Sequence, residues 1–408
     1  MKGKKNLLLM MGIIGPGIIT ANAGNDAGGI TTYSVVGAHY GYSMLWGMLI
    51  IGVGLAVIQE MNARMAVVTG KGLSDLIRER FGVRWAFFAM LVLLIANLGV
   101  CIGDFAGIAA SLELFNISKY FSIPVITLLI WVLLTKGDYS KAEKVFFVLT
   151  LAFISYFITA ILVKPDWGHV ITSIVRPQAK FDAGYFLVLI GMVGTTITPY
   201  MQFYLQSSIV DKGISIKEYA YEKLDVYIGT AFAIITALFI TICTAETLFK
   251  AGINITYAQD AALALKPLAG NNSFILLAVG LFGASLLACC VIPLSTAYAV
   301  CEAFGFESGV DNKIKEAPVF FGIFLLMLII SAVVILVPNI SLIKIILFTQ
   351  QLAGILCPIV LIFMVKLVND EEVMGAHTNT SLQNFIAKGT IILIVILTCI
   401  VLASNFIS

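Results

Sequence analysis

Apolar stretches of about 20 residues recur along the whole chain, and only short polar segments separate them. A helix of that length crosses the roughly 30 Å of hydrocarbon in a bilayer. The pattern predicts eleven spans, near residues 6–36, 42–68, 86–112, 121–136, 142–163, 184–209, 221–248, 273–303, 317–337, 341–367 and 386–406. The expected fold class is therefore an all-α polytopic membrane protein embedded in a lipid bilayer.

Two of the predicted spans contain residues that interrupt a helix. The first is broken by "GNDAGG" at 24–29, and the sixth is broken around "TTITPY" at 195–200, where Pro199 removes a backbone donor. The two breaks lie five spans apart, which is typical of two inverted five-helix repeats whose broken helices meet at the bilayer midplane. We therefore predict a first repeat, a second repeat and an additional C-terminal helix, over residues 1–163, 164–368 and 369–408.

The composition agrees with a membrane protein and excludes several other classes. Hydrophobic residues make up 60% of the chain and charged residues 12%, with a mean hydropathy of +1.01. The sequence has neither a glycine-rich phosphate loop nor a basic nucleic-acid patch, so we expect no cofactor and no nucleic-acid partner. Its seven cysteines include no C-x-x-C pair, which favours packing over metal binding. The oligomeric state is not determined by the sequence, and a monomer is compatible with it.

The basic residues of the short loops predict the topology. Basic residues at 2–5, in "KGLSDLIRERFGVR" (71–84) and in "KGDYSKAEK" (136–144) favour the cytoplasm. We expect a plasma-membrane protein with a cytoplasmic N-terminus and an extracellular C-terminus, although the loop at 164–182, assigned outside, is also basic. The basic start followed by "ANA" at 21–23 also resembles a cleavable signal peptide, but the apolar pattern resumes beyond the glycines.

The carboxylate inside the first break is the strongest candidate for a functional residue. An uncompensated aspartate at membrane depth costs a few kcal/mol, and neither break has a lysine or arginine nearby. A bound cation, coordinated by Asp26 and by backbone carbonyls that the break frees, is the natural partner. The alternative is that Asp26 caps the half-helix that follows it. Both roles are compatible, because a capping carboxylate still offers an oxygen to a metal.

Several motifs resemble those of one transporter family. "GPGIITANAGNDAGGI" at 15–30 resembles the first helix of the NRAMP family of divalent metal transporters, in which G-P-G precedes D-P-G-N. "QEMNARMAVVTGKGLSDLIRERFG" at 59–82 is similar to the end of its second helix, and "GTTITPYMQFYLQSS" at 194–208 to its broken sixth. The resemblance implies a fold like that of amino-acid/sodium symporters, a divalent metal substrate and alternating access.

The differences from the family motifs bear on the choice of ion. Asp26 matches the family's aspartate, but Gly29 stands at its metal-binding asparagine and Thr198 at its sixth-helix methionine. Two ligands are lost, which leaves more space around one carboxylate. Hard cations such as Mg²⁺ prefer oxygen ligands and keep several waters. The sequence is thus most similar to the NRAMP-related magnesium transporters, and we expect largely hydrated Mg²⁺, and also Mn²⁺. In a shifted register Met201 would supply a sulfur and restore selectivity for transition metals.

The resemblance also implies the remaining ligands. Ala23 and Thr195 stand where the family contributes backbone carbonyls, and Gln350 stands where its tenth helix contributes an amide. Asn22 and Asn25 are additional polar groups that could bind metal-bound water. Each amide side chain has an ordinary alternative role, which is to bridge two helices of the bundle.

Proton coupling is expected to be weak or absent. The resemblance implies a proton relay made of a histidine on the sixth helix and acidic residues on the third. At the matching positions this chain has Tyr200, Asn97 and Gly107, and it keeps only Asp104. A relay needs groups that titrate near the working pH, and tyrosine, with a pKa of about 10, does not. Asp104 then either is structural or lines an inner vestibule. The three histidines all lie in predicted loops: His39, His169 and His377.

Three alternatives of other kinds remain at this point. Asp26 and Asp104 could be imagined as an intramembrane protease pair, but "CIGDF" at 101–105 lacks the first glycine of G-x-G-D. An organic-solute carrier on the same architecture would hold a carboxylate at a half-helix N-terminus, where Asp26 would repel it. A proton-coupled Mn²⁺/Fe²⁺ transporter is the third. We expect a transporter and no enzymatic activity.

Overall fold

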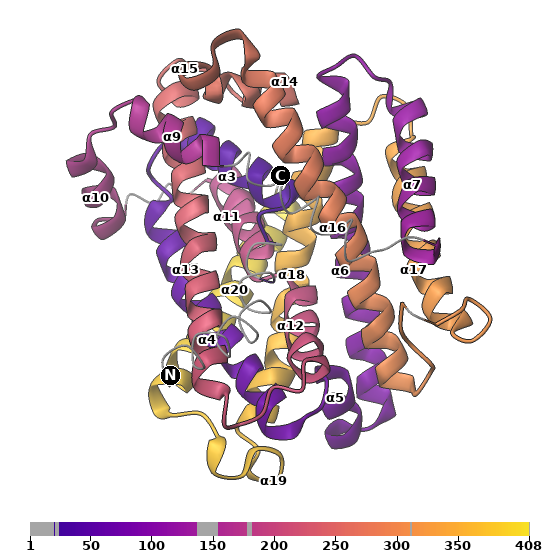
Figure 1. Ribbon diagram of the computed structural model, residues 1–408. Coiled ribbons are helices and arrows are strands. Elements are labelled where there is room, and N and C mark those ends of the chain that lie inside the picture. Colours follow the sequence, from indigo (N-terminus) through magenta and orange to yellow (C-terminus); the bar gives the residue numbers. More distant parts are fainter. Residues whose placement is uncertain (1–19, 21–23, 137–153, 178–181, 311, 408) are drawn as a thin grey trace, which may run out of the picture.

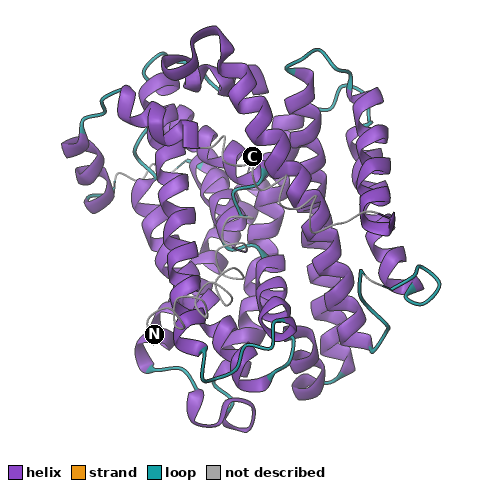
Figure 2. Cartoon of the chain, in the orientation of Figure 1, coloured by secondary structure: helices purple, strands orange, loops and turns teal. Residues whose placement is uncertain are grey.

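The computed structural model describes residue 20 and residues 24–136, 154–177, 182–310 and 312–407. Within these residues the chain consists of helices and loops (Figure 2). Its elements are α3 (Ala27–Tyr40), α4 (Leu45–Thr69), α5 (Leu73–Phe81), α6 (Val83–Glu113), α7 (Lys119–Lys136), α9 (Ile154–Leu162), α10 (Trp167–Val175), α11 (Ala183–Thr196), α12 (Pro199–Asp211), α13 (Tyr219–Thr244), the π-helical η2 (Ala245–Phe249), α14 (Ala258–Ala262), η3 (Leu263–Leu265), α15 (Lys266–Ala269), η4 (Gly270–Asn272), α16 (Ser273–Phe304), α17 (Pro318–Ile335), α18 (Leu342–Val368), α19 (Glu371–Met374), η5 (Gly375–His377) and α20 (Ser381–Ile407).

The predicted all-α membrane architecture is confirmed. Eight helical segments of the described part are long and apolar enough to cross a bilayer. Several large apolar side chains on their outer faces are exposed, among them Leu326 (53%), Val333 (59%) and Ile392 (58%). Such side chains are stable when lipid tails surround them.

The long helices form one bundle with short elements at its two ends. Helices α5 and α19 lie at one end, whereas α10, α14 and α15 lie at the other (Figure 1). The predicted loop at 164–182 contains α10, which forms because the Asp166 carboxylate accepts hydrogen bonds from the amides of Gly168 and His169.

The boundaries of the two repeats and of the additional C-terminal helix, at 1–163, 164–368 and 369–408, stay a prediction.

Glycine allows the central helices to approach closely. A Cβ added at Gly194 of α11 would lie 1.9 Å from the carbonyl oxygen of Gln350 on α18. One at Gly354 of α18 would lie 2.4 Å from the carbonyl oxygen of Ile190. Backbones at this separation exclude any side chain, as in the small-residue contacts of membrane helices. The contact fixes α18 beside α11, the first half of the predicted sixth span.

Candidate metal site

The first break lies directly before α3. Asp26 is the N-cap of this helix, its backbone is extended, and its Oδ1 accepts a hydrogen bond of 2.9 Å from the amide of Gly29. Its residue exposure is only 3%, and Asn25 beside it is also buried. The predicted capping role is confirmed. The cap occupies one carboxylate oxygen, which leaves the other available to a cation.

The second break separates α11 from α12. Ile197 ends α11, Thr198 has an extended backbone (φ −76°, ψ 140°), and Pro199 is the first residue of α12. Proline suits this first position because its missing N–H would have no helical partner there. The hydroxyl of Thr198 donates to the carbonyl oxygen of Thr195 at 3.3 Å. The break therefore gathers a hydroxyl and a carbonyl oxygen at one buried point.

The two breaks lie side by side. Tyr33 of α3 and Thr196 of α11 share a hydrogen bond of 2.8 Å between their hydroxyls. A Cβ added at Gly29 would lie 3.4 Å from Oγ1 of Thr195 and 2.4 Å from the carbonyl oxygen of Gly24. We expected open space where Gly29 replaces a larger residue. The expectation is wrong on this side of the break, because the backbone of Gly24 fills that space and places an oxygen there.

Gln350 of α18 lies against the first break. A Cβ added at Gly28 would lie 2.0 Å from Nε2 of Gln350, so this glycine makes room for the amide. Gln350 is buried, and neither polar atom of its amide has a hydrogen-bond partner within the described part of the chain. A buried amide without partners is costly. Its position and its unused oxygen fit a ligand of an ion held between the breaks.

Asp104 of α6 also contacts the first break. Its Oδ1 accepts a hydrogen bond of 3.3 Å from the amide of Ala27, the first residue of α3, and its Oδ2 has no partner among the described residues. The side chain is completely buried, and its carboxylate interacts electrostatically with that of Asp26. Of the two roles that the sequence left open for Asp104, these contacts support the structural one, because its carboxylate accepts a hydrogen bond at the helix break itself.

The other predicted residues lie at varying distances from the breaks. Asn97 donates to the hydroxyl of Thr296 on α16 at 2.7 Å and so bridges two helices. Tyr200 is buried and interacts electrostatically with both aspartates, whereas Met201 belongs to the apolar core. At Gly107 a Cβ would lie 2.4 Å from that of Ala27, so no acidic side chain fits there. Two predicted residues fall outside the described residues: Asn22 and Ala23.

Sequence reasoning missed one sulfur at the second break. The thiol of Cys357 on α18 donates to the carbonyl oxygen of Ile197 at 3.0 Å, and Cys357 is fully buried. No sequence signal distinguishes this cysteine from the other apolar ones. In the described residues no group of three or more His, Cys, Asp or Glu side chains could hold a metal. An ion at the breaks would therefore depend largely on neutral oxygens.

The histidines are remote from the breaks, although not in loops. His39 lies in the last turn of α3, and the other two lie in α10 and η5. The prediction of loops is wrong: α3 continues through His39, the Asp166 cap starts the helix that contains His169, and His377 lies in a short 3₁₀ turn. At 1.5 Å per residue, the 13 residues from Asp26 to His39 correspond to about 20 Å along the helix.

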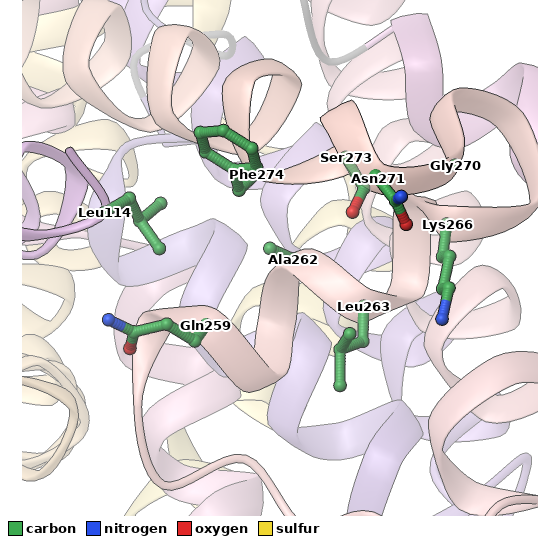
Figure 3. A pocket seen from close by; sticks show the side chains of 9 residues that line it. All are labelled: Leu114, Gln259, Ala262, Leu263, Lys266, Gly270, Asn271, Ser273 and Phe274. Atoms are coloured by element: carbon green, nitrogen blue, oxygen red, sulfur yellow. The ribbon is translucent and has the colours of Figure 1, made fainter.

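The surface pocket shown in Figure 3 is not the predicted site. Its volume is about 330 Å³, and it lies among α14, α15, the start of α16 and the end of α6. The only charged side chain that lines it is that of Lys266, which would repel a divalent cation. None of its lining residues belongs to either helix break.

Comparison with known proteins identifies the family. The Nramp family, described as natural resistance-associated macrophage protein-like, matches residues 17–404. The chain belongs to the Nramp family. Similar proteins include the divalent metal cation transporters MntH of Yersinia pestis (24% identical, covering 97% of this chain and 96% of that one) and of Erwinia tasmaniensis (26%, 97% and 94%). The protein is accordingly a membrane transporter and not an enzyme.

Solved structures show the same fold. The Eremococcus coleocola manganese transporter superposes with a TM-score of 0.81 at 18% identity, over 97% of this chain and 87% of that one. Mhp1, a nucleobase-cation-symport-1 family transporter, gives 0.57 at 12% identity, over 96% and 91%. The expectation of a symporter-like fold is confirmed.

Proposed function

We propose that this protein carries Mg²⁺, and also Mn²⁺, across the plasma membrane by alternating access. The names of its relatives, divalent metal cation transporters and a manganese transporter, support a divalent metal as the substrate class. The ion would be held largely hydrated between the break before α3 and the break between α11 and α12. The basic loops support a cytoplasmic N-terminus and an extracellular C-terminus.

The observation that carries this proposal is the donor set at the two breaks. Asp26 supplies a carboxylate, Thr198 a hydroxyl, Thr195 a carbonyl and Gln350 an amide, and these groups are buried together. All four groups would bind an ion through oxygen, and only the Asp26 carboxylate is charged. Hard cations accept such a set while they keep several waters. The carbonyl of Ala23 would complete the site by family resemblance, and Gly29 stands at the position of the family's asparagine ligand.

We further propose that transport needs little or no proton coupling. Tyr200 stands at the position of the family's histidine, and the nearest histidine on α3 is about 20 Å from Asp26 along the helix. An inside-negative membrane potential acts on two positive charges and supplies about 4.6 kcal/mol per 100 mV. This driving force is sufficient to concentrate the ion without protons.

A second candidate function is proton-coupled transport of Mn²⁺ or Fe²⁺, and two observations favour it. The carboxylate of Asp104 contacts the first break, where it could exchange a proton as the ion binds. The sulfur of Cys357 lies at the second break, and sulfur favours softer metals. Asp104 contacts the first break and Cys357 contacts the second. A transport measurement is therefore needed to choose between the two candidate functions.

The deciding experiment is uptake into proteoliposomes at a set membrane potential. Fluorescent indicators inside the vesicles would follow Mg²⁺ or Mn²⁺, and a pH dye would follow acidification in parallel. We expect entry of both ions without acidification. Acidification that accompanies Mn²⁺ entry, together with no Mg²⁺ entry, would establish the second candidate instead. Vesicles without protein provide the background rate.

A further inference from the structure

The first turn of α12 after the second break carries a further buried polar side chain. Gln202 lies four residues after Thr198, and its Nε2 donates to the Thr198 carbonyl oxygen at 3.4 Å. Side chains on a helix point toward its N-terminus, so this amide lies at the end of α12 that faces the break. Gln202 is completely buried.

A second buried amide lies against the same turn from another helix. Nδ2 of Asn62 on α4 donates to the backbone carbonyl oxygen of Gln202. Asn62 is also completely buried. The Asn62 side chain on α4 therefore contacts the backbone of α12 at Gln202, about one turn after the break. Helices α12 and α5 both lie in the lower part of the bundle in Figure 1.

The hydrogen bonds fix the orientation of both amides. In each case the nitrogen faces a carbonyl oxygen, and a flipped amide would place two acceptors against each other. The oxygens, Oε1 of Gln202 and Oδ1 of Asn62, therefore point elsewhere. Neither has a donor among the described residues. Two buried acceptors thus lack a hydrogen: one belongs to the amide that contacts the Thr198 carbonyl oxygen, and the other to the amide that contacts the Gln202 carbonyl oxygen one turn farther along α12.

Water bound to a metal ion is a donor that suits such acceptors. Its oxygen is engaged by the metal, so both of its hydrogens are free to donate. Mg²⁺ usually keeps several of its waters in protein sites. We propose that Gln202 and Asn62 accept hydrogen bonds from the water shell of the transported ion and thereby favour a hydrated divalent cation. This role rests on the proposed function and adds residues that select the ion through its water.

The test compares the two ions in variants that lack the acceptors. Gln202→Met keeps the length of the side chain and removes its oxygen, and Asn62→Leu does the same on α4. For each variant we expect Mg²⁺ uptake at subsaturating concentration to fall roughly tenfold, as the loss of one good hydrogen bond implies. Mn²⁺ uptake should fall less than about threefold, because Mn²⁺ binding depends less on retained water.

Gln206→Met provides a matched control on the same helix. Gln206 is equally buried, and its Oε1 also has no donor among the described residues, but its Nε2 donates to the carbonyl oxygen of Lys71 at 2.9 Å and it lies about 6 Å farther along α12 from the break. We expect this variant to keep the wild-type ratio of Mg²⁺ to Mn²⁺ uptake. A ratio that changes equally in Gln206→Met would overturn the proposal, because it would indicate general damage to α12.

Two further outcomes are decisive. Equal losses for both ions in Gln202→Met and Asn62→Leu would mean that these amides only support the break, and the proposal would be wrong. Wild-type vesicles that take up Mn²⁺ but no Mg²⁺ would refute the proposed function itself, and the role of the amides with it. Thermal unfolding of each purified variant in detergent would show whether a loss of transport reflects a loss of folded protein.

Discussion

Asp26→Asn separates the two roles that the structure supports for this residue. The carboxylate caps α3 through the Gly29 amide at 2.9 Å and faces the gap between the two breaks. Asparagine caps a helix about as well as aspartate, so the hydrogen bond is retained. The substitution removes the negative charge alone. Any effect on transport then reports the interaction between this charge and the ion.

The expected magnitude follows from electrostatics. At an effective dielectric constant of about 20, a divalent ion about 4 Å from a carboxylate is stabilised by roughly 8 kcal/mol. If water and neighbouring dipoles compensate about three quarters of this, about 2 kcal/mol is lost, which corresponds to roughly a thirtyfold weaker affinity. The loss of favourable charge at the helix N-terminus costs only about 0.3–1 kcal/mol of stability.

Asp182→Asn is the matched control. Asp182 caps α11 by accepting from the Tyr185 amide at 2.8 Å, three residues along, which is the same capping geometry. It stands at the far end of α11 from the break, so its charge should matter little to the ion. Both variants should unfold at nearly the same temperature as the wild type in detergent.

Initial uptake rates in proteoliposomes at subsaturating Mg²⁺ and Mn²⁺ would measure the effect. We expect Asp26→Asn to lose at least about thirtyfold for both ions and Asp182→Asn to retain the wild-type rate. Wild-type uptake by Asp26→Asn would remove this carboxylate from the site. Equal losses in the two variants would show that capping, and not the charge, is what transport requires.

Two further predictions concern packing and a buried ion pair. Gly194→Ala should abolish folded protein in detergent, because its Cβ would lie 1.9 Å from the Gln350 carbonyl oxygen. Gly191→Ala is the control and should be tolerated, because its nearest contact is 3.5 Å. Comparable yields of the two variants in size-exclusion chromatography would contradict this. Arg64→Met should lower the free energy of unfolding by about 3–5 kcal/mol, because it leaves the Glu60 carboxylate, 3.1 Å from Arg64 and 1% exposed, with the neutral donors Tyr219 and Gln383 but without its cationic partner. A double variant with Glu60→Gln should recover part of this loss of thermal stability.

The sequence determined the class of fold because bilayer thickness dictates the length of each span. The break before α3 was also predictable, since glycines weaken a helix and a buried aspartate needs a partner. Pro199 marked the second break for a similarly local reason. These inferences use only neighbours in the chain, and the structure shows both breaks where the sequence predicted them.

Contacts between distant residues depended on tertiary packing. Asp104 lies 77 residues from Ala27, and its hydrogen bond to that amide follows from the position of α6 beside the break. Cys357 reaches the Ile197 carbonyl because paired glycines bring α18 against α11. Similarly, Arg64 does not extend to the interface as an isolated helical residue does, but binds the carbonyl oxygens of His377 and Thr378.

What the sequence alone determined is thus the set of spans, the two breaks and the single carboxylate of the first break. The tertiary structure decided which groups surround that carboxylate, and it filled the space beside Gly29 with the Gly24 carbonyl oxygen. The physical reason is that span length and helix interruption are local properties of the chain. The oxygens that face an ion depend instead on how helices far apart in the sequence pack against one another.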